Sequence, residues 1–189
     1  SAAGGGRVAA DLVDKIAGRP LPTPCLVGEP TSFRTFRMHP GHVAVKVTTT
    51  GRAAHSSKPD LGDNAIRKAA AAIVALDELA ERWRRDVRFA DVLERPFVVM
   101  NVATIRGGSV INIVPDRCEI DVGFRPLPGM DEAVLVDELR AAVAPFGTTT
   151  LSRVTPALLT PPGTALEQVL APFSTGGGAA AFATDGGNL

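Results

Sequence analysis

The stretch GRAAHSSKPDLGDNAI, residues 51–66, joins two segments of opposite patterning. Before it, HVAVKVTTTG (42–51) alternates apolar and polar residues with period two, which predicts a half-buried strand. After it, residues 64–85 carry apolar side chains at helical spacing, so we expect a helix with Asp63 as its N-cap. His55 therefore lies in a polar turn between a strand and a helix, where its imidazole is presented rather than buried.

Further along the chain the same patterns repeat. FVVMNVATI (97–105) reads as a strand, and INIVPDRCEIDVGFR (111–125) as a longer one with Pro115 at a bulge or edge. Asp131 can cap a helix over 132–143, and TTTLSRVT (148–155) reads as the last strand. The order strand, helix, strand, strand, helix, strand predicts an α+β, ferredoxin-like domain of four antiparallel strands and two helices over about 41–154. Its exposed sheet edge would offer a surface for a homodimer.

The flanking segments have a different character. Residues 1–40 read as connecting material, with a short helix at about 7–17, a Pro-rich link and an apolar strand end at CLVG (25–28). TALEQVLAPF (164–173) predicts a short helix before a Gly- and Ala-rich tail. At 189 residues the chain is long enough for one small domain plus part of another, and it lacks an initiator Met, so we expect a fragment of a longer protein.

Composition excludes several classes of function. Twenty basic and twenty acidic side chains cancel, and no basic–aromatic stretch occurs, so we expect no nucleic-acid partner. No apolar run reaches the ~20 residues that a membrane span needs. The N-terminal segment lacks the pattern of a signal peptide. Cys25 and Cys118 both stand in apolar contexts, so each is expected to be a buried free thiol.

Two residues are the first candidates for chemistry. Glu29 is fixed between Gly28 and Pro30 at a predicted strand end, where its carboxylate could bind zinc or simply form a turn. His55 could donate a hydrogen bond to a developing oxyanion or act as an acid–base group. The plainer alternative is a turn histidine bonded to its neighbours.

Three further residues are candidates for binding. Asn112 and Arg125 lie 13 residues apart on one predicted strand, and a bulge near Pro115 would bring them to the same face. Arg125 could hold a carboxylate with two hydrogen bonds, or form a surface salt bridge. Thr184 forms a polar step in FATDGG (182–187), for which a helix N-cap is the simpler account. His39 and His42 read as structural. No GxSxG, P-loop or Cys–His nucleophile pair is present, which disfavours a serine or cysteine hydrolase.

Taken in order, these segments resemble the zinc amidohydrolase family that includes acetylornithine deacetylase, succinyl-diaminopimelate desuccinylase and glutamate carboxypeptidase. The resemblance covers residues 25–189. The matching strings are VGEPT (27–31), HPG (39–41), TGRAAHSSKPDLGDNAI (50–66), RGGSVINIVPDRCEIDVGFRPLPG (106–129) and FATDGG (182–187). The strings at 50–66 and 106–129 are specific, and the HSS and FRPLPG wording is most similar to acetylornithine deacetylases.

The resemblance implies a catalytic α/β domain with two zinc ions, or cobalt or manganese, interrupted by a lid and dimerisation domain. Residues 1–40 and 155–189 would be parts of the catalytic domain, and 41–154 the lid. Glu29 matches a zinc ligand, and His55 matches a lid histidine that polarises the scissile carbonyl, commonly in the partner subunit. Asn112, Arg125 and Thr184 match the substrate side of the site. The implied substrate is an N-acyl amino acid or small peptide, and the implied location is cytoplasmic.

The chain also departs from the family pattern. The remaining metal ligands of the family, and the Glu that activates the water, have no counterpart among these 189 residues. We therefore expect the chain to be inactive alone, because a catalytic zinc site needs about three protein ligands. The alternative is a non-catalytic dimerisation module, or a catalytically dead scaffold that kept the lid.

Overall fold

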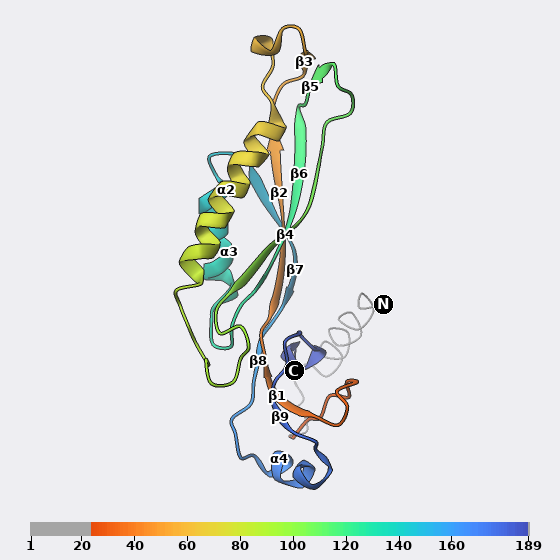
Figure 1. Ribbon diagram of the computed structural model, residues 1–189, viewed down its shortest axis with the longest axis vertical. Coiled ribbons are helices and arrows are strands. Elements are labelled where there is room, and N and C mark those ends of the chain that lie inside the picture. Colours follow the sequence, from red (N-terminus) through yellow and green to blue (C-terminus); the bar gives the residue numbers. More distant parts are fainter. Residues whose placement is uncertain (1–23, 189) are drawn as a thin grey trace, which may run out of the picture.

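A computed structural model describes residues 24–188 (Figure 1). The predicted helix at about 7–17 lies outside these residues. The described chain is elongated, with a four-stranded sheet and two helices in its middle, a two-stranded tip at one end, and a small three-stranded sheet at the other. We call the end of the four-stranded sheet at His42 the base.

The central sheet has the order β4-β6-β2-β7, with every neighbouring pair antiparallel. Helices α2 and α3 cover one face, and the other face, which we call the open face, is not covered by a helix of the described chain (Figure 1). The order along the chain confirms the predicted ferredoxin-like fold. The elements are β2 (His42–Thr50), α2 (Ala65–Trp83), β4 (Val99–Gly107), β6 (Arg117–Arg125), α3 (Glu132–Val143) and β7 (Thr148–Thr155).

Helix α2 packs closely on the sheet because small residues line the first half of its inner face. Its buried side chains recur every three or four residues, as a helix with one inward face requires. They are Ala65, Ala69, Ala72, Leu76, Leu79 and Trp83. The predicted N-cap is wrong by one residue: Asn64 Oδ1 accepts the N–H groups of Ile66 and Arg67, while Asp63 pairs with Lys68. In α3, Asp131 is the N-cap, as predicted.

The predicted long strand 111–125 is two strands. Pro115 separates β5 (Ile113–Val114) from β6, and Asn112 precedes β5 in a turn. Proline has no N–H to continue the ladder, and its carbonyl instead accepts the N–H of Ala65. Strand β5 pairs with β3 (Ala54–His55), so that the tip extends beyond the central sheet (Figure 1).

A second sheet lies beyond the base, and the sequence did not indicate it. Strand β1 (Thr35–His39) pairs in parallel with β9 (Gly177–Ala179) and antiparallel with β8 (Leu158–Leu159). Residues 35–39 are therefore part of a sheet rather than connecting material. The predicted helix in 164–173 is present as α4 (Ala165–Leu170), capped by Thr164, followed by the 3₁₀ turn η2 (Ala171–Phe173).

Two smaller expectations are wrong. CLVG (25–28) forms no strand, and Cys25 is exposed, whereas Cys118 is a buried free thiol as predicted. Leu26 is also exposed, which shows that a short apolar run does not by itself mark a buried strand. Among residues 24–188, no helix is long and apolar enough to cross a membrane.

Candidate functional site

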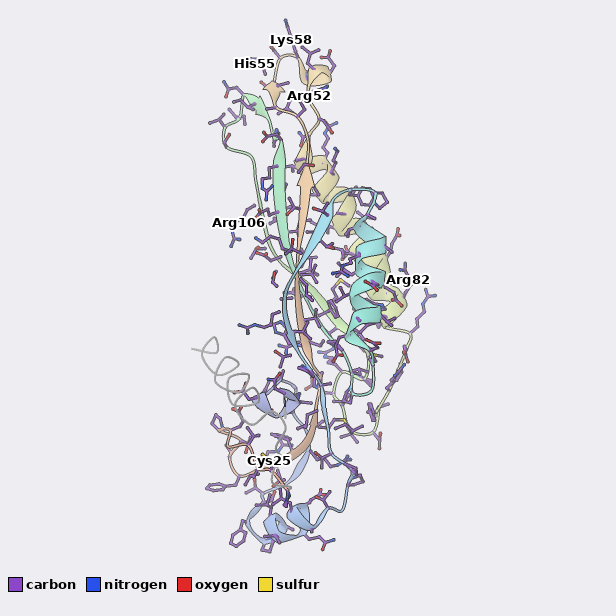
Figure 2. The ribbon with its side chains drawn as sticks, turned by 180° about the vertical axis from the view of Figure 1, so that it is seen from behind. Cys25, Arg52, His55, Lys58, Arg82 and Arg106 are labelled. Atoms are coloured by element: carbon purple, nitrogen blue, oxygen red, sulfur yellow. The ribbon has the colours of Figure 1, made fainter. Side chains whose placement is uncertain are left out.

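His55 lies at the tip, exposed at the end of β3 (Figure 2). Its position is fixed by backbone contacts on both sides: the β3–β5 pair places it opposite Ile113, and the N–H of Ser56 donates to Asn112 O at 2.9 Å. His55 and Asn112, two of the predicted site residues, therefore lie on neighbouring segments of the tip.

The imidazole of His55 is oriented by its own turn. Nδ1 accepts the backbone N–H of Ser57 at 3.2 Å and lies 2.8 Å from the Ser57 hydroxyl. An acceptor at Nδ1 places the proton of the neutral ring on Nε2. The free Nε2–H is then a hydrogen-bond donor directed away from the turn. Both earlier readings of His55, a turn histidine bonded to its neighbours and a donor to an oxyanion, are compatible with this geometry.

A second group of predicted site residues lies beyond the base. Glu29 and Thr184, together with His39, line an open cavity of about 640 Å³ between 24–37, β8 and the C-terminal segments. Glu29 is exposed and belongs to a turn in which its carbonyl accepts the N–H of Thr31. Thr184 precedes η3 (Asp185–Asn188) and caps it as the sequence indicated, because its hydroxyl oxygen accepts the N–H of Gly186 at 3.2 Å. The same hydroxyl lies 2.9 Å from Nε2 of His39.

His39 is the best-anchored polar side chain of this cavity, with 1% of its surface exposed. Nδ1 lies 3.0 Å from the Pro40 carbonyl, which fixes the proton on Nδ1. Nε2 is therefore an acceptor, for the Thr184 hydroxyl at 2.9 Å and the Thr184 N–H at 3.3 Å. Burial lowers the pKa of His39, and the nearby Arg125 lowers it further. The sequence indicated a structural role for His39 but not that it holds the 182–188 segment.

Arg125 ends β6 at the base, half-buried, and burial lowers the pKa of its guanidinium. It does not lie near Asn112. The nine residues of β6 separate the two positions, and at about 3.3 Å per residue the strand alone spans roughly 26 Å. A single chain thus holds the predicted residues as two groups, His55 with Asn112 at the tip and Arg125, Glu29 and Thr184 near the base.

The described residues do not make up a metal site. Between 24 and 188, no group of three or more His, Cys, Asp or Glu side chains is placed to hold an ion. Glu29 could supply one oxygen ligand, but both ring nitrogens of His39 are engaged in hydrogen bonds. Residues 24–188 alone therefore offer too few donors for a catalytic zinc.

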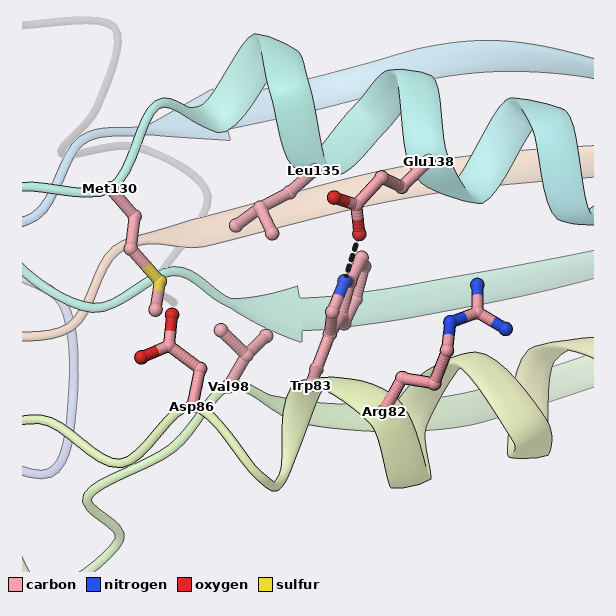
Figure 3. A pocket seen from close by; sticks show the side chains of 7 residues that line it. All are labelled: Arg82, Trp83, Asp86, Val98, Met130, Leu135 and Glu138. Atoms are coloured by element: carbon pink, nitrogen blue, oxygen red, sulfur yellow. Dashed lines mark hydrogen bonds between the residues drawn. The ribbon is translucent and has the colours of Figure 1, made fainter.

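A smaller cavity of about 340 Å³ lies where α2 ends against α3 (Figure 3). The indole N–H of Trp83 donates to Glu138 Oε2, and Leu135, Val98 and Met130 supply apolar walls. Trp83 also stacks obliquely on Phe124, with ring centroids 5.1 Å apart. These contacts tie the two helices to the sheet, and none of the predicted site residues is among them.

The chain is similar to known proteins in sequence and in fold. Residues 37–147 match the family model described as a peptidase dimerisation domain. Acetylornithine deacetylase of Vibrio cholerae is 38% identical over 109 residues, which are 58% of this chain and 29% of that protein. The enzyme of the same name from Erwinia tasmaniensis is 34% identical over 141 residues, 75% of this chain and 37% of that protein. The chain thus spans about a third of the length of these relatives.

Solved structures show the same fold. A putative aminohydrolase from methicillin-resistant Staphylococcus aureus has a TM-score of 0.61 at 20% identity, covering 82% of this chain and 43% of that one. The aminopeptidase PepT from Bacillus cereus has a TM-score of 0.59 at 18% identity, covering 82% and 42%. At these identities the likeness concerns the fold alone.

Proposed function

Because the chain belongs to the M20 peptidase dimerisation domain family, we propose that it is the lid and dimerisation portion of a metal-dependent hydrolase. The bond cleaved is the amide of an N-acyl amino acid or a small peptide, with an acetylornithine deacetylase-like reaction supported by the named relatives. In this proposal 41–154 is the lid, and 1–40 and 155–189 belong to a cytoplasmic enzyme's catalytic domain.

The observation that carries the proposal is the separation of the predicted residues. His55 and Asn112 at the tip cannot reach Arg125, Glu29 and Thr184 in the same chain, because the length of β6 lies between them. A second copy of the chain could place its tip over the base of the first. The active site would then be shared, and a homodimer would be needed for activity.

In such a shared site His55 supplies a hydrogen bond. Its Nε2–H, free because Nδ1 accepts from Ser57, would donate to the carbonyl oxygen of the scissile amide. That bond strengthens as negative charge develops on the oxygen during attack by water. Removing one such donor costs roughly 10²–10³ in kcat in known hydrolases.

The remaining residues would bind and orient. Arg125 would hold the substrate carboxylate, and Asn112 of the opposing tip and Thr184 would contact the substrate from either side. Glu29 would be one of the ligands of a zinc, cobalt or manganese ion. Since the described residues hold too few donors for that ion, we expect residues 1–189 alone to show no hydrolase activity.

A subunit-mixing experiment tests the shared site on the complete natural polypeptide. His55→Ala and Glu29→Ala are each expected to be inactive as homodimers. After unfolding and refolding the two variants together at equal amounts, half of the dimers are mixed, and each mixed dimer has one site with both side chains. Activity should return to about a quarter of the wild-type value.

Two results would contradict the shared site. Activity that stays absent after mixing, while wild type refolded alongside recovers, would place both residues in one subunit's site. Normal turnover by His55→Ala alone would remove His55 from catalysis altogether.

A second candidate function is supported by the small number of metal ligands among the described residues. A non-catalytic dimerisation module, or a scaffold that lost catalysis, would need no metal ligands, and the described residues contain no cluster of them. In that case the complete polypeptide would dimerise but would not hydrolyse N-acyl amino acids in the presence of zinc, cobalt or manganese.

A further inference from the structure

The open face of the central sheet divides into two electrostatic zones. In the zone toward the tip, both carboxylates have cationic partners. Glu119 accepts from Lys46 and Arg117, and Asp121 accepts from Arg106 and Thr104. These bonds lower the pKa of both carboxyls. This zone therefore has no unpaired carboxylate left for a cationic ligand.

The zone at the base is different. Strand register places His42 beside Arg125 on the open face, since their neighbours Val43 and Phe124 are paired. Two residues further along β2, Ala44 is paired with Arg153 of β7 on one side and with Gly123 of β6 on the other. Burial lowers the pKa of His42, and the nearby Arg125 and Arg153 lower it further.

The two arginines of this zone have no carboxylate partner in the part of the chain that the structure describes. Among residues 24–188, no ion pair within 4.0 Å involves Arg125 or Arg153, although Arg125 is half-buried. A guanidinium removed from water without a partner is costly, and such sites are suited to an anionic ligand. Gly123 has no side chain, and the His42 ring lies against it, since a Cβ at Gly123 would be 3.5 Å from His42 Nε2. Asn101, paired with Gly123, borders it from β4.

We propose that His42 and Arg153 extend the Arg125 position into a two-part anion site, which selects N-acyl amino acids with a negatively charged side chain over those with a positively charged one. The reaction would still be hydrolysis of an N-acyl amide, but the preferred side chain would differ from the cationic one of N-acetylornithine, after which the relatives are named. The inference rests on the proposed function for the assignment of Arg125 to the carboxylate that all such substrates share. His42 and Arg153 then face the side chain. An ammonium group there meets the positive charge of Arg153, whereas a second carboxylate meets hydrogen-bond donors of Arg153 and of the His42 ring.

Three ligands with the same backbone test the proposal by titration calorimetry on the 189-residue chain at low salt. They are N-acetyl-L-glutamate, N-acetyl-L-norvaline and N-acetyl-L-ornithine, with side-chain charges of −1, 0 and +1. We expect the dissociation constant to rise in that order, by roughly threefold to tenfold at each step. Arg125→Gln should weaken all three by about tenfold or more.

Three variants show whether the selectivity comes from a local site at the base or from the overall positive charge of the open face. Arg153→Gln and His42→Gln should compress the differences among the ligands, while Arg106→Gln, an exposed cation of the same face that already pairs with Asp121, should leave them unchanged. Equal or tighter binding of the ornithine derivative would overturn the proposal. So would equal compression by Arg106→Gln, or the absence of millimolar binding by all three ligands.

The outcome is independent of catalysis, because no turnover is measured. If the subunit-mixing experiment fails and the order of affinities holds, the anion site stands without the shared active site. If mixing restores activity and the order is reversed, only the selectivity is lost.

Discussion

His39 joins two segments that are 145 residues apart, and its contacts depend on its protonation state. As a neutral ring it donates from Nδ1 to Pro40 O and accepts at Nε2 from Thr184. A proton on Nε2 would remove the acceptor and place a charge in a buried position close to Arg125. The bond between His39 and the segment 182–188 therefore requires neutral His39, while Phe182 also holds this segment through its edge-on contact with Phe36.

Stability should therefore depend on pH through this residue. The folded-state pKa of His39 is lowered below its ordinary value of 6.5, so the unfolded chain binds the proton first as pH falls. The free energy of unfolding should be highest above about pH 6.5 and should decrease as pH falls from there through the folded-state pKa. Urea titrations at pH 8 and pH 5.5 measure the difference.

The control is His39→Gln, whose amide oxygen can still accept from Thr184 but does not titrate. We expect it to lose about 1–2 kcal/mol at pH 8, since the bond to Pro40 is lost, and to show a smaller decrease between pH 8 and 5.5. His42 also has a lowered pKa, so His42→Gln serves as the second control. An unchanged pH dependence in His39→Gln would assign the effect to other groups.

At the scale of elements, the N-terminus of α2 shows how a one-residue error arises. Asp63 and Asn64 are both good caps by composition, and only the geometry decides between them. Asp63 is engaged elsewhere: its backbone pairs with Arg52, and its carboxylate pairs with Lys68. Asn64, with extended backbone dihedrals, is the residue whose side chain faces the free N–H groups.

Substitution by alanine should distinguish the two residues. Asn64→Ala is expected to decrease the free energy of unfolding by about 1 kcal/mol, because two helix N–H groups lose their acceptor. Asp63→Ala should cost less than about 0.5 kcal/mol, because its ion pair is half-exposed. Chemical denaturation of both variants under one condition provides the comparison, and a larger loss for Asp63→Ala would reverse the assignment.

The central sheet and its helices could be predicted from the sequence because those elements are long and each buries one face. Strand β2 alternates over nine residues, and α2 repeats its apolar face over nineteen. Strands β8 and β9, of two and three residues, are too short to show a period, and β1 is identified only by its partners across the chain. The candidate site residues remain predictions. Their division between tip and base follows from the length of β6, because nine residues of extended strand keep Arg125 away from the tip that holds Asn112.

At the scale of the whole molecule, two edges of the central sheet are candidates for pairing with a second copy. Strand β7 contacts η3 near the base and α3 along its length. Strand β4 has a free backbone edge beside α2, and apolar side chains are exposed along it: Ile105 on β4, 50% exposed, with Ile66 and Val74 on α2. An edge with adjacent apolar groups is the more favourable dimer surface.

A charge at this edge should therefore separate the subunits. Ile105→Glu is expected to convert the proposed homodimer to a monomer, since a buried unpaired carboxylate would oppose association. Leu151→Glu, a comparably exposed position on β7, should leave the dimer intact. Analytical ultracentrifugation over a range of concentrations gives the association state. A monomer from Leu151→Glu and a dimer from Ile105→Glu would move the interface to β7.

The base of the sheet has one further consequence. The strand that starts the lid and the strand that finishes it are paired there, His42 with Thr155, and Gly41 approaches so closely that a Cβ would lie 2.8 Å from Thr155 O. The first and last residues of the segment 42–155 therefore lie next to each other. A short bridge could close that gap, so this portion can be removed, lengthened or exchanged between relatives with little disturbance to the flanking sheet. In the proposed hydrolase, substrate choice could then change when the whole segment 42–155 is exchanged, as well as when single side chains are changed.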